Sequence, residues 1–302
     1  MRIAVLGAGA MGMLFGGYLS EQNDVCLVEV NRERVEKIRT DGILVHTGAV
    51  VQRFFPGIVS ETAGMEPADL ILVFVKAMYT TAALEANRSL IGPDTYIMTL
   101  QNGAGHEVKL LQFADKAHVI IGTTQHNSSV LANGEISHGG CGQTTIGLLE
   151  GDSARLEPIA KLFTACGIDC VTAQDVKRQI WKKLFTNTAA STLTAVLQVP
   201  LGFLCENEDA HAIMAALCRE AVQVANAEGF ACFAEAEVLA EVEGVCRNAK
   251  NGYTSIYADI RDGRRTEVDT ISGSVIEAAR ALGIAVPYHE MLVHLIHALE
   301  QR

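Results

Sequence analysis

A glycine-rich turn near the N-terminus constrains this chain more than any other feature. Residues Gly7-Ala8-Gly9-Ala10-Met11-Gly12 fit the pattern G-x-G-x-x-G, directly after the apolar run Ile3–Leu6. In a strand–turn–helix unit the first glycine permits the tight turn and the second lets a pyrophosphate approach the backbone. The third lets the helix pack close to the strand. The turn therefore predicts a Rossmann domain that binds a dinucleotide through these residues.

Apolar strand-like runs alternate with helical patterns through the first half of the chain. The expected strands are Ile3–Leu6, Val25–Val30, Leu70–Val75, Tyr96–Leu100 and Val119–Gly122, and the expected helices include Met11–Ser20, Arg32–Thr40, Tyr79–Leu90, Gly105–Phe113 and Leu156–Cys166. Such alternation predicts a parallel, doubly wound sheet with helices on its faces. The glycine-punctuated runs Glu135–His138 and Thr144–Leu149 predict an antiparallel hairpin at the sheet edge, and Asp169–Thr172 a last strand.

From Asp175 onward the pattern is almost wholly helical. The periodic segments are Ile180–Val196, Ala210–Glu228, Ala234–Asn248, Glu267–Leu282 and His289–Leu299. A chain of 302 residues has room for two domains. We therefore predict an α/β protein with a dinucleotide-binding Rossmann domain over residues 1–172 and an all-α domain over residues 173–302 that carries the substrate and catalytic residues.

Charge and composition exclude several classes of function. The net charge of -11 argues against nucleic acid or an anionic membrane as a partner. No segment is apolar for 18 residues, the N-terminal apolar run is too short for a signal peptide, and the eight cysteines are scattered, so a cytoplasmic location is expected. The histidines His289, His294 and His297 have no tight metal-ligand spacing, and no metal is expected. An alanine-rich helical second domain is compatible with a homodimer.

The end of the second predicted strand carries conflicting signals about the dinucleotide. Glu29 follows Gly12 by 17 residues, where an acid accepts hydrogen bonds from the adenosine ribose hydroxyls and favours NAD. Arg32 and Arg34 come soon after it, and an arginine can instead hold the 2′-phosphate of NADP. The residues by themselves favour NAD weakly.

A polar stripe runs along the otherwise apolar segment Ile180–Val196. Lys183, Asn187, Ser191 and Thr194 are spaced four, four and three residues apart, so they share one face of an α-helix. A buried lysine is unfavourable without a partner, and its convergence with a carboxamide and hydroxyls indicates a small polar ligand. The alternative, equally weighted, is a lysine whose ammonium reaches solvent.

Three other positions are candidates for the site. Lys76 and Asn102 each follow a predicted strand, at the sheet edge where Rossmann domains bind ligands. The alternative for Lys76 is a solvated surface lysine, and the alternative for Asn102 is a turn without a binding role. Glu267 stands at the start of the predicted helix Glu267–Leu282, with Thr266 as its cap; the alternative role for Glu267 is compensation of the helix dipole.

Several motifs in the same order resemble the ketopantoate reductase (2-dehydropantoate 2-reductase) family over residues 1–300. They are the glycine-rich turn, Val75-Lys76-Ala77, Gln101-Asn102-Gly103, Gly122-Thr123-Thr124, Trp181-Lys182-Lys183-Leu184-x-x-Asn187 and Thr266-Glu267-Val268-Asp269. The resemblance implies reduction of a 2-oxo acid to a 2-hydroxy acid with NADPH, in pantothenate biosynthesis.

The resemblance also implies roles for individual residues. Lys183 matches the proton donor, Asn187 and Ser255 match substrate-binding residues, Asn102 matches an asparagine that touches cofactor and substrate, Glu267 matches an acid near the cofactor and the lysine, and Lys76 matches a lysine beside the cofactor. The expected cofactor is NADPH, with NAD kept open because of Glu29.

Three departures from the family pattern keep rival interpretations open. Ser191 and Leu201 stand where the family has asparagines, although Ser191 is still expected to contact substrate, and Val30 stands where an arginine for the 2′-phosphate is expected. The rivals are a related hydroxyacid dehydrogenase with a different acid as substrate, and a non-catalytic dinucleotide-binding sensor. The set of Lys183, Asn187 and Glu267 argues against the sensor, which needs no proton donor.

Overall fold

The computed structural model describes all 302 residues, from Met1 to Arg302. The chain divides into two compact units. Unit 1 comprises Met1–Gln101 and His106–Val176, and unit 2 comprises Asn102–Gly105 and Lys177–Arg302. The short loop that carries Asn102 thus groups with the helical unit, which the sequence pattern did not indicate. The division into separate domains over residues 1–172 and 173–302 stays a prediction.

Unit 1 contains an eight-stranded sheet that runs β12-β11-β8-β7-β6-β1-β2-β5. Its strands are β1 (Arg2–Leu6), β2 (Asp24–Val28), β5 (Gly57–Val59), β6 (Leu70–Val73), β7 (Tyr96–Thr99), β8 (Val119–Thr124), β11 (Thr144–Leu148) and β12 (Cys170–Thr172). The six strands from β5 to β8 are parallel, and β11 pairs with β8 in the antiparallel sense. The strand order reverses between β1 and β6, which is where doubly wound sheets bind ligands.

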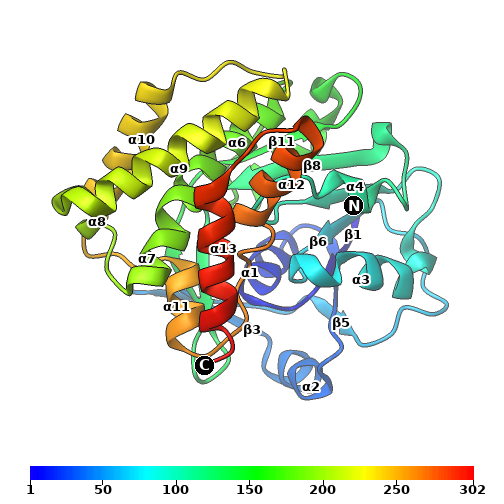
Figure 1. Ribbon diagram of the computed structural model, residues 1–302. Helices are drawn as coiled ribbons and strands as arrows, with labels where there is room; N and C mark the ends of the chain where they lie inside the picture. The colour runs from blue at the N-terminus through cyan, green and yellow to red at the C-terminus, as the bar shows by residue number, and fades with distance from the viewer. The chain divides into compact units, whose positions relative to one another are not determined.

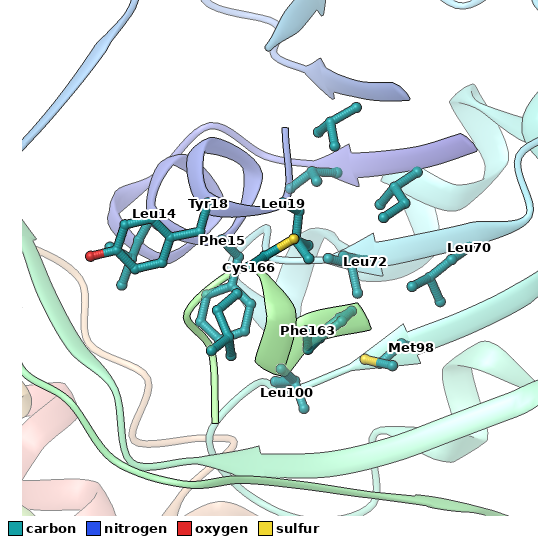
Figure 2. Close-up of a cluster of buried hydrophobic side chains, with 14 of the residues drawn as sticks. Leu14, Phe15, Tyr18, Leu19, Leu70, Leu72, Met98, Leu100, Phe163 and Cys166 are labelled. Atoms are coloured by element: carbon teal, nitrogen blue, oxygen red, sulfur yellow. The ribbon is translucent and has the colours of Figure 1, made fainter. Parts of the chain in front are cut away.

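Helix α1 (Ala10–Leu19) covers this sheet with its buried side chains. Figure 2 shows Leu14, Phe15 and Leu19 of α1 beside side chains of β6 and β7, with Phe163 of α5 (Glu157–Ala165) on the same side. Phe15 and Phe163 are fully buried, and their rings lie 6.3 Å apart. The apolar core thus fixes the helix whose first turn carries the glycines. The predicted doubly wound α/β fold with a helical C-terminal region is confirmed.

A second, four-stranded sheet in unit 1 was not predicted. It runs β4 (Val50–Phe54), β3 (Ile43–Thr47), β10 (Ile136–Gly140) and β9 (Asn127–Val130), in that order. The predicted hairpin of Glu135–His138 with Thr144–Leu149 is therefore wrong, because β10 pairs with β3 and β9 while β11 joins the large sheet. Ile136 and His138 are buried near α1. Four of the five residues of β11 are buried, as expected for a strand inside the large sheet.

The remaining helices of unit 1 are α2 (Arg32–Asp41), α3 (Thr80–Ala86) and α4 (Glu107–Leu110), with 3₁₀ turns at Ala77–Tyr79, Arg88–Leu90, Lys116–His118 and Ser153–Leu156. Helix α2 matches the prediction of a helix over Arg32–Thr40, whereas α3 and α4 are shorter than the sequence pattern suggested. The predicted helix Tyr79–Leu90 is interrupted at Asn87, whose side chain is drawn into hydrogen bonds with Thr62 and the Ala83 carbonyl. Side chains of Ser, Thr, Asn and Asp compete with helical hydrogen bonding in this way.

Unit 2 is a packed group of helices, coloured from green to red in Figure 1. They are α6 (Val176–Thr186), α7 (Thr192–Leu197), α8 (Phe203–Glu206), α9 (Glu208–Ala227), α10 (Glu235–Asn248), α11 (Ser255–Arg261), α12 (Ser272–Leu282) and α13 (Pro287–Leu299). Helix α13 packs against α7, α9 and α12. The start of α13 is fixed by Glu220, whose carboxylate accepts hydrogen bonds from the N–H groups of Tyr288 and His289 and contacts the His289 ring.

One turn of the predicted helix Ile180–Val196 is wider than an α-helix. Residues Asn187–Ser191 form a π-turn between α6 and α7. A π-turn places one extra residue in a helical turn and shifts the faces of the helix on either side of it, and such turns are frequent at functional sites. It begins at Asn187 and ends at Ser191, two of the residues expected to contact substrate.

None of the helices is both long and apolar enough to cross a lipid bilayer.

Candidate active site

The glycine-rich turn joins β1 to α1 at the carboxyl edge of the sheet. Gly7 has φ +99, a backbone angle that residues with a Cβ atom rarely adopt. A Cβ atom on Gly12 would lie 1.9 Å from the carbonyl oxygen of Gly7, so only glycine allows the helix to start this close to the strand. The first N–H groups of α1 lack partners within the helix and point towards the turn, where they favour an anion.

The backbone of the turn is open at Gly9. Gly9 is the N-cap of α1, and a Cβ atom built on it meets nothing within 4 Å. Glycine is therefore not needed at position 9 for packing, in contrast to position 12. An open approach to the backbone next to a helix N-terminus is the geometry that a pyrophosphate requires.

Glu29 stands directly after β2 and is held against the glycine-rich turn. Its Oε2 atom accepts a hydrogen bond from the Ala8 N–H over 3.1 Å, and its Oε1 atom accepts one from the Asn31 N–H over 2.9 Å. Arg34 forms an ion pair with Oε2 at 3.2 Å. The carboxylate is buried, whereas the side chain of Val30, where the family pattern has arginine, is 86 % exposed. The turn thus presents a fixed negative charge beside Ala8.

The side chain of Gln101, just after β7, forms hydrogen bonds with residues that follow or end β6 and β7. Its amide contacts the Val75 carbonyl and the hydroxyls of Thr80 and Thr99. Lys76 lies just past β6 with its side chain exposed, at the sheet edge where the sequence predicts it. Gln101 also fixes the start of the loop that carries Asn102.

Lys183 of α6 meets Asn102 within unit 2. The lysine Nζ atom donates a hydrogen bond to the Asn102 Oδ1 atom over 2.9 Å. The negative charge of the Glu267 carboxylate also attracts the Lys183 ammonium and favours its charged form. The structure therefore brings together Lys183, Asn102 and Glu267, which are widely separated in the sequence.

Burial sets the acidity of this lysine. Removal from water lowers the pKa of Lys183 from its usual 10.5 to about 8, and the Glu267 carboxylate partly opposes that shift. An amine with a pKa of about 8 is mostly protonated at neutral pH and can still give up its proton easily. A group of this kind is suited to donate a proton to an oxygen atom that gains negative charge.

The polar stripe on this helix is only partly a ligand-facing surface. Thr194 is fully buried, and its hydroxyl bonds to the carbonyl oxygens of Ala190 and Ser191 and to the Thr254 hydroxyl. Thr194 therefore has a structural role, although its spacing from Lys183, Asn187 and Ser191 had grouped it with the ligand-facing residues. Asn187 begins the π-turn with its side chain partly exposed, and Ser191 ends it with its side chain buried.

Two further candidates lie on the neighbouring segment of unit 2. Ser255 is the exposed first residue of α11, and Thr254 before it caps that helix through the Tyr257 N–H. Leu201 is almost fully buried in the apolar core of unit 2, and its N–H donates to the Gly252 carbonyl. An apolar group thus occupies the position where the family pattern has an asparagine.

Glu267 does not begin a helix, which corrects the prediction of a helix over Glu267–Leu282. Helix α12 begins at Ser272, and Glu267 lies in a tight turn whose carbonyl accepts hydrogen bonds from the N–H groups of Thr270 and Ile271. The Thr266 hydroxyl accepts from the Val268 N–H inside this turn instead of capping a helix. The Thr270 hydroxyl also donates to the Glu267 carbonyl, so three hydrogen bonds to one oxygen close this turn.

Two family profiles match most of the chain. The profile described as ketopantoate reductase PanE/ApbA matches residues 3–151, and the one described as ketopantoate reductase PanE/ApbA C terminal matches residues 175–300. The chain belongs to the ketopantoate reductase family. The resemblance seen in the sequence motifs is confirmed, and the family is one of oxidoreductases.

Relatives of known name and solved structures are similar to this chain along its full length. The 2-dehydropantoate 2-reductase of Halobacterium salinarum is 31% identical, over 100% of this chain and 99% of the relative. A structure of D-mandelate dehydrogenase with NADH and anilino(oxo)acetate is 30% identical with a TM-score of 0.93, over 100% of this chain and 98% of the other. The 2-dehydropantoate 2-reductase of Geobacter metallireducens is 29% identical with a TM-score of 0.91, over 99% of both chains. Together they support a nicotinamide dinucleotide as the cofactor class.

Sequence reasoning missed the residues that hold the site in shape. Gln101 stood inside a motif without a role, and Arg34 was expected to compete for a phosphate, whereas it pairs with Glu29. The π-turn left no periodic signal, since its residues fit an α-helix equally well. The one signal that could have indicated the π-turn is the pair of hydroxyl side chains at Thr188 and Thr192, four residues apart on an apolar helix.

Replacing Gly9 and Gly12 by alanine should have different effects. Gly9→Ala leaves the fold and its melting temperature unchanged, because the new methyl group enters open space, but it obstructs a pyrophosphate and weakens dinucleotide binding by about tenfold or more. Gly12→Ala lowers the melting temperature as well, because its methyl group collides with the Gly7 carbonyl. Calorimetric titration with NADH and thermal unfolding separate the two effects. Wild-type dinucleotide affinity in Gly9→Ala would contradict this role of the turn.

Proposed function

We propose that this protein reduces a 2-oxo acid to the corresponding 2-hydroxy acid, with 2-dehydropantoate as the first candidate substrate, using a reduced nicotinamide dinucleotide. The observation that carries the proposal is the buried Lys183 ammonium, bonded to Asn102 and acted on by Glu267. Family membership and relatives named 2-dehydropantoate 2-reductase support it.

In this proposal the chain supplies binding, orientation and a proton. When bound, the reduced nicotinamide would provide the hydride that C2 of the substrate accepts. As negative charge develops on the C2 oxygen, Lys183 stabilises it and donates the proton from Nζ. Asn102 holds Nζ in place, and Asn187, Ser191 and Ser255 orient the substrate, while Lys76 lies beside the cofactor. Glu267 keeps Lys183 charged against the cost of burial.

A second candidate substrate class follows from the side chain at position 201. Leu201 is buried in the apolar core of unit 2 and supplies no amide where the family pattern has an asparagine, and a solved relative of the same fold is a D-mandelate dehydrogenase. Without that amide a substrate hydroxyl would lose a hydrogen bond, which favours a 2-oxo acid whose branched or aromatic substituent carries no hydroxyl. Turnover of 2-oxo-2-phenylacetate in preference to 2-dehydropantoate would establish this candidate.

For the cofactor, the family resemblance implies NADPH, and we propose NADH instead. A 2′-phosphate next to the buried Glu29 carboxylate would meet a like charge, whereas a ribose hydroxyl can donate to it. Arg34 is already paired with Glu29, and Val30 offers no positive charge.

Turnover is the direct test of the proposal. Purified protein with NADH or NADPH should oxidise the cofactor in the presence of 2-dehydropantoate or another member of a panel of 2-oxo acids, followed at 340 nm. Lys183→Met should lower kcat by about 10²- to 10⁴-fold, because the proton donor is lost, while dinucleotide affinity stays unchanged. Lys182→Met, at the exposed neighbouring position, is the matched control. Cofactor binding without turnover of any acid would favour the sensor interpretation.

The pH dependence of kcat should report on Lys183. Because its pKa of about 8 describes the proton donor, the rate of reduction is full below pH 7 and falls about tenfold per pH unit above pH 8. Glu267→Gln removes the carboxylate that raises this pKa, so the fall begins at lower pH. A profile that stays flat to pH 9.5 would remove Lys183 from the proton-transfer step.

Neutralising Glu29 should change the choice of dinucleotide. The wild-type protein prefers NADH, and Glu29→Gln raises the ratio of kcat/KM for NADPH over NADH by about tenfold, which corresponds to ~1.4 kcal/mol. The amide oxygen can still accept from the Ala8 N–H, whereas the hydrogen bond from the Asn31 N–H is lost, and thermal unfolding measures the effect on the fold. Glu33→Gln, which removes an exposed charge in the first turn of α2, is the control and leaves the ratio unchanged. A wild-type preference for NADPH would refute the cofactor proposal alone.

A further inference from the structure

Three buried hydroxyls join the π-turn to the start of α12. The Ser272 Oγ atom lies 3.0 Å from Thr188 Oγ1 and 2.8 Å from Thr192 Oγ1. All three residues have no exposed surface. A hydroxyl can donate one hydrogen bond and accept two, so Ser272 can bond to both threonines and each of the three hydroxyls has a partner without water. We call Thr188, Thr192 and Ser272 the hydroxyl cluster.

On one side the hydroxyl cluster holds both ends of the π-turn. Thr188 directly follows Asn187, and Thr192 directly follows Ser191. Lys183 lies one helical turn before Asn187 on the same continuous helix. Any rotation or slide of this helix at the π-turn would therefore move Asn187 and Lys183 together.

On the other side the hydroxyl cluster is tied to Glu267 by a short, rigid segment. The Glu267 carbonyl accepts from the N–H groups of Thr270 and Ile271 at 3.0 and 3.1 Å, and the Val268 carbonyl accepts from the Gly273 N–H at 2.9 Å. Ser272 lies within this bonded segment. The position of its hydroxyl is therefore coupled to that of the Glu267 backbone.

We propose that the hydroxyl cluster is a positioning device for the reaction, which sets where Lys183 and Asn187 stand relative to Glu267. This inference rests on the function proposed above. Lys183 and its counter-charge come from two separate segments of unit 2, and the hydroxyl cluster is a direct side-chain link between them. The attraction between two charges removed from water changes steeply with their separation, so a small displacement alters the charge state of the lysine. Displacements of about 1 Å also lower the rate of well-oriented reactions by about 100-fold.

Removal of single hydroxyls tests the proposal. Thr192→Val has nearly the same shape without the hydroxyl, Thr192→Ser keeps the hydroxyl without the methyl group, and Ser272→Ala removes the central partner. Ser274→Ala is the matched control, because Ser274 is a buried serine of the same helix whose hydroxyl bonds to the Ile271 carbonyl within its own turn.

The measurements are kcat and KM from pH 6 to 10, NADH affinity, and the titration of Lys183 followed through its ¹³C-labelled ε-carbon, identified by comparison with Lys183→Met. In Thr192→Val and Ser272→Ala we expect kcat about 10- to 100-fold lower, NADH affinity unchanged, and a Lys183 pKa below the wild-type value, because Glu267 supports the charge less. Thr192→Ser should restore the wild-type titration and most of kcat, and Ser274→Ala should match wild type.

The possible failures can be told apart. Folded Thr192→Val and Ser272→Ala proteins with a wild-type Lys183 titration would overturn the positioning role. That role is also overturned if Thr192→Ser is as impaired as Thr192→Val, because packing of the methyl group would then explain the loss. A wild-type protein that turns over no acid would overturn the proposed function, and the Lys183 titration would still decide the positioning role.

Discussion

Unit 2 holds one positive charge, the Lys183 ammonium, largely removed from water. An ammonium group buried without partners would lose its proton or destabilise the fold. Lys183 can stay protonated because Asn102 accepts its hydrogen bond and Glu267 opposes the effect of burial on its pKa. These partners come from a loop after β7 and from a turn before α12, so the surrounding elements have to bring three distant segments to one place.

The π-turn carries a structural cost that local hydroxyls offset. A π-turn leaves carbonyl groups of the helix with altered hydrogen bonding. The hydroxyls of Thr194 and Thr254 bond to the Ser191 carbonyl, and Thr194 also bonds to the Ala190 carbonyl. Thr254 caps α11 as well, directly before Ser255. One set of hydroxyls thus stabilises the widened turn and connects it to the segment that carries a proposed substrate contact.

The sequence predicted what depends on local pattern and missed what depends on distant contacts. The glycine-rich turn and the alternating runs identified the doubly wound sheet, because each glycine has a local steric reason. The second sheet escaped prediction because β3 and β10 meet only in the folded chain, far apart in sequence.

Within the site the same distinction holds. Spacing alone placed Lys183 and Asn187 on one helix, but the wider turn between Asn187 and Ser191 follows an α-helical pattern in sequence and is set by contacts with Ser272 and Thr254. The position of Glu267 before α12, instead of inside it, likewise depends on hydrogen bonds that close a turn, which no periodicity records.

Glu29 shows why cofactor choice and catalysis can vary independently in this fold. Its carboxylate braces the glycine-rich turn through the Ala8 N–H and also presents a charge where the adenosine ribose is expected. Glu29 is part of unit 1, whereas Lys183, Asn102 and Glu267 are part of unit 2. Under the proposed function, a substitution at position 29 or 30 would therefore change the electrostatics at one end of the dinucleotide and leave the proposed proton donor Lys183 unchanged. The Ala8 N–H has its acceptor in the Glu29 side chain whichever dinucleotide binds, so the proposed selection between dinucleotides acts through the charge of that side chain and not through its hydrogen bond to the turn.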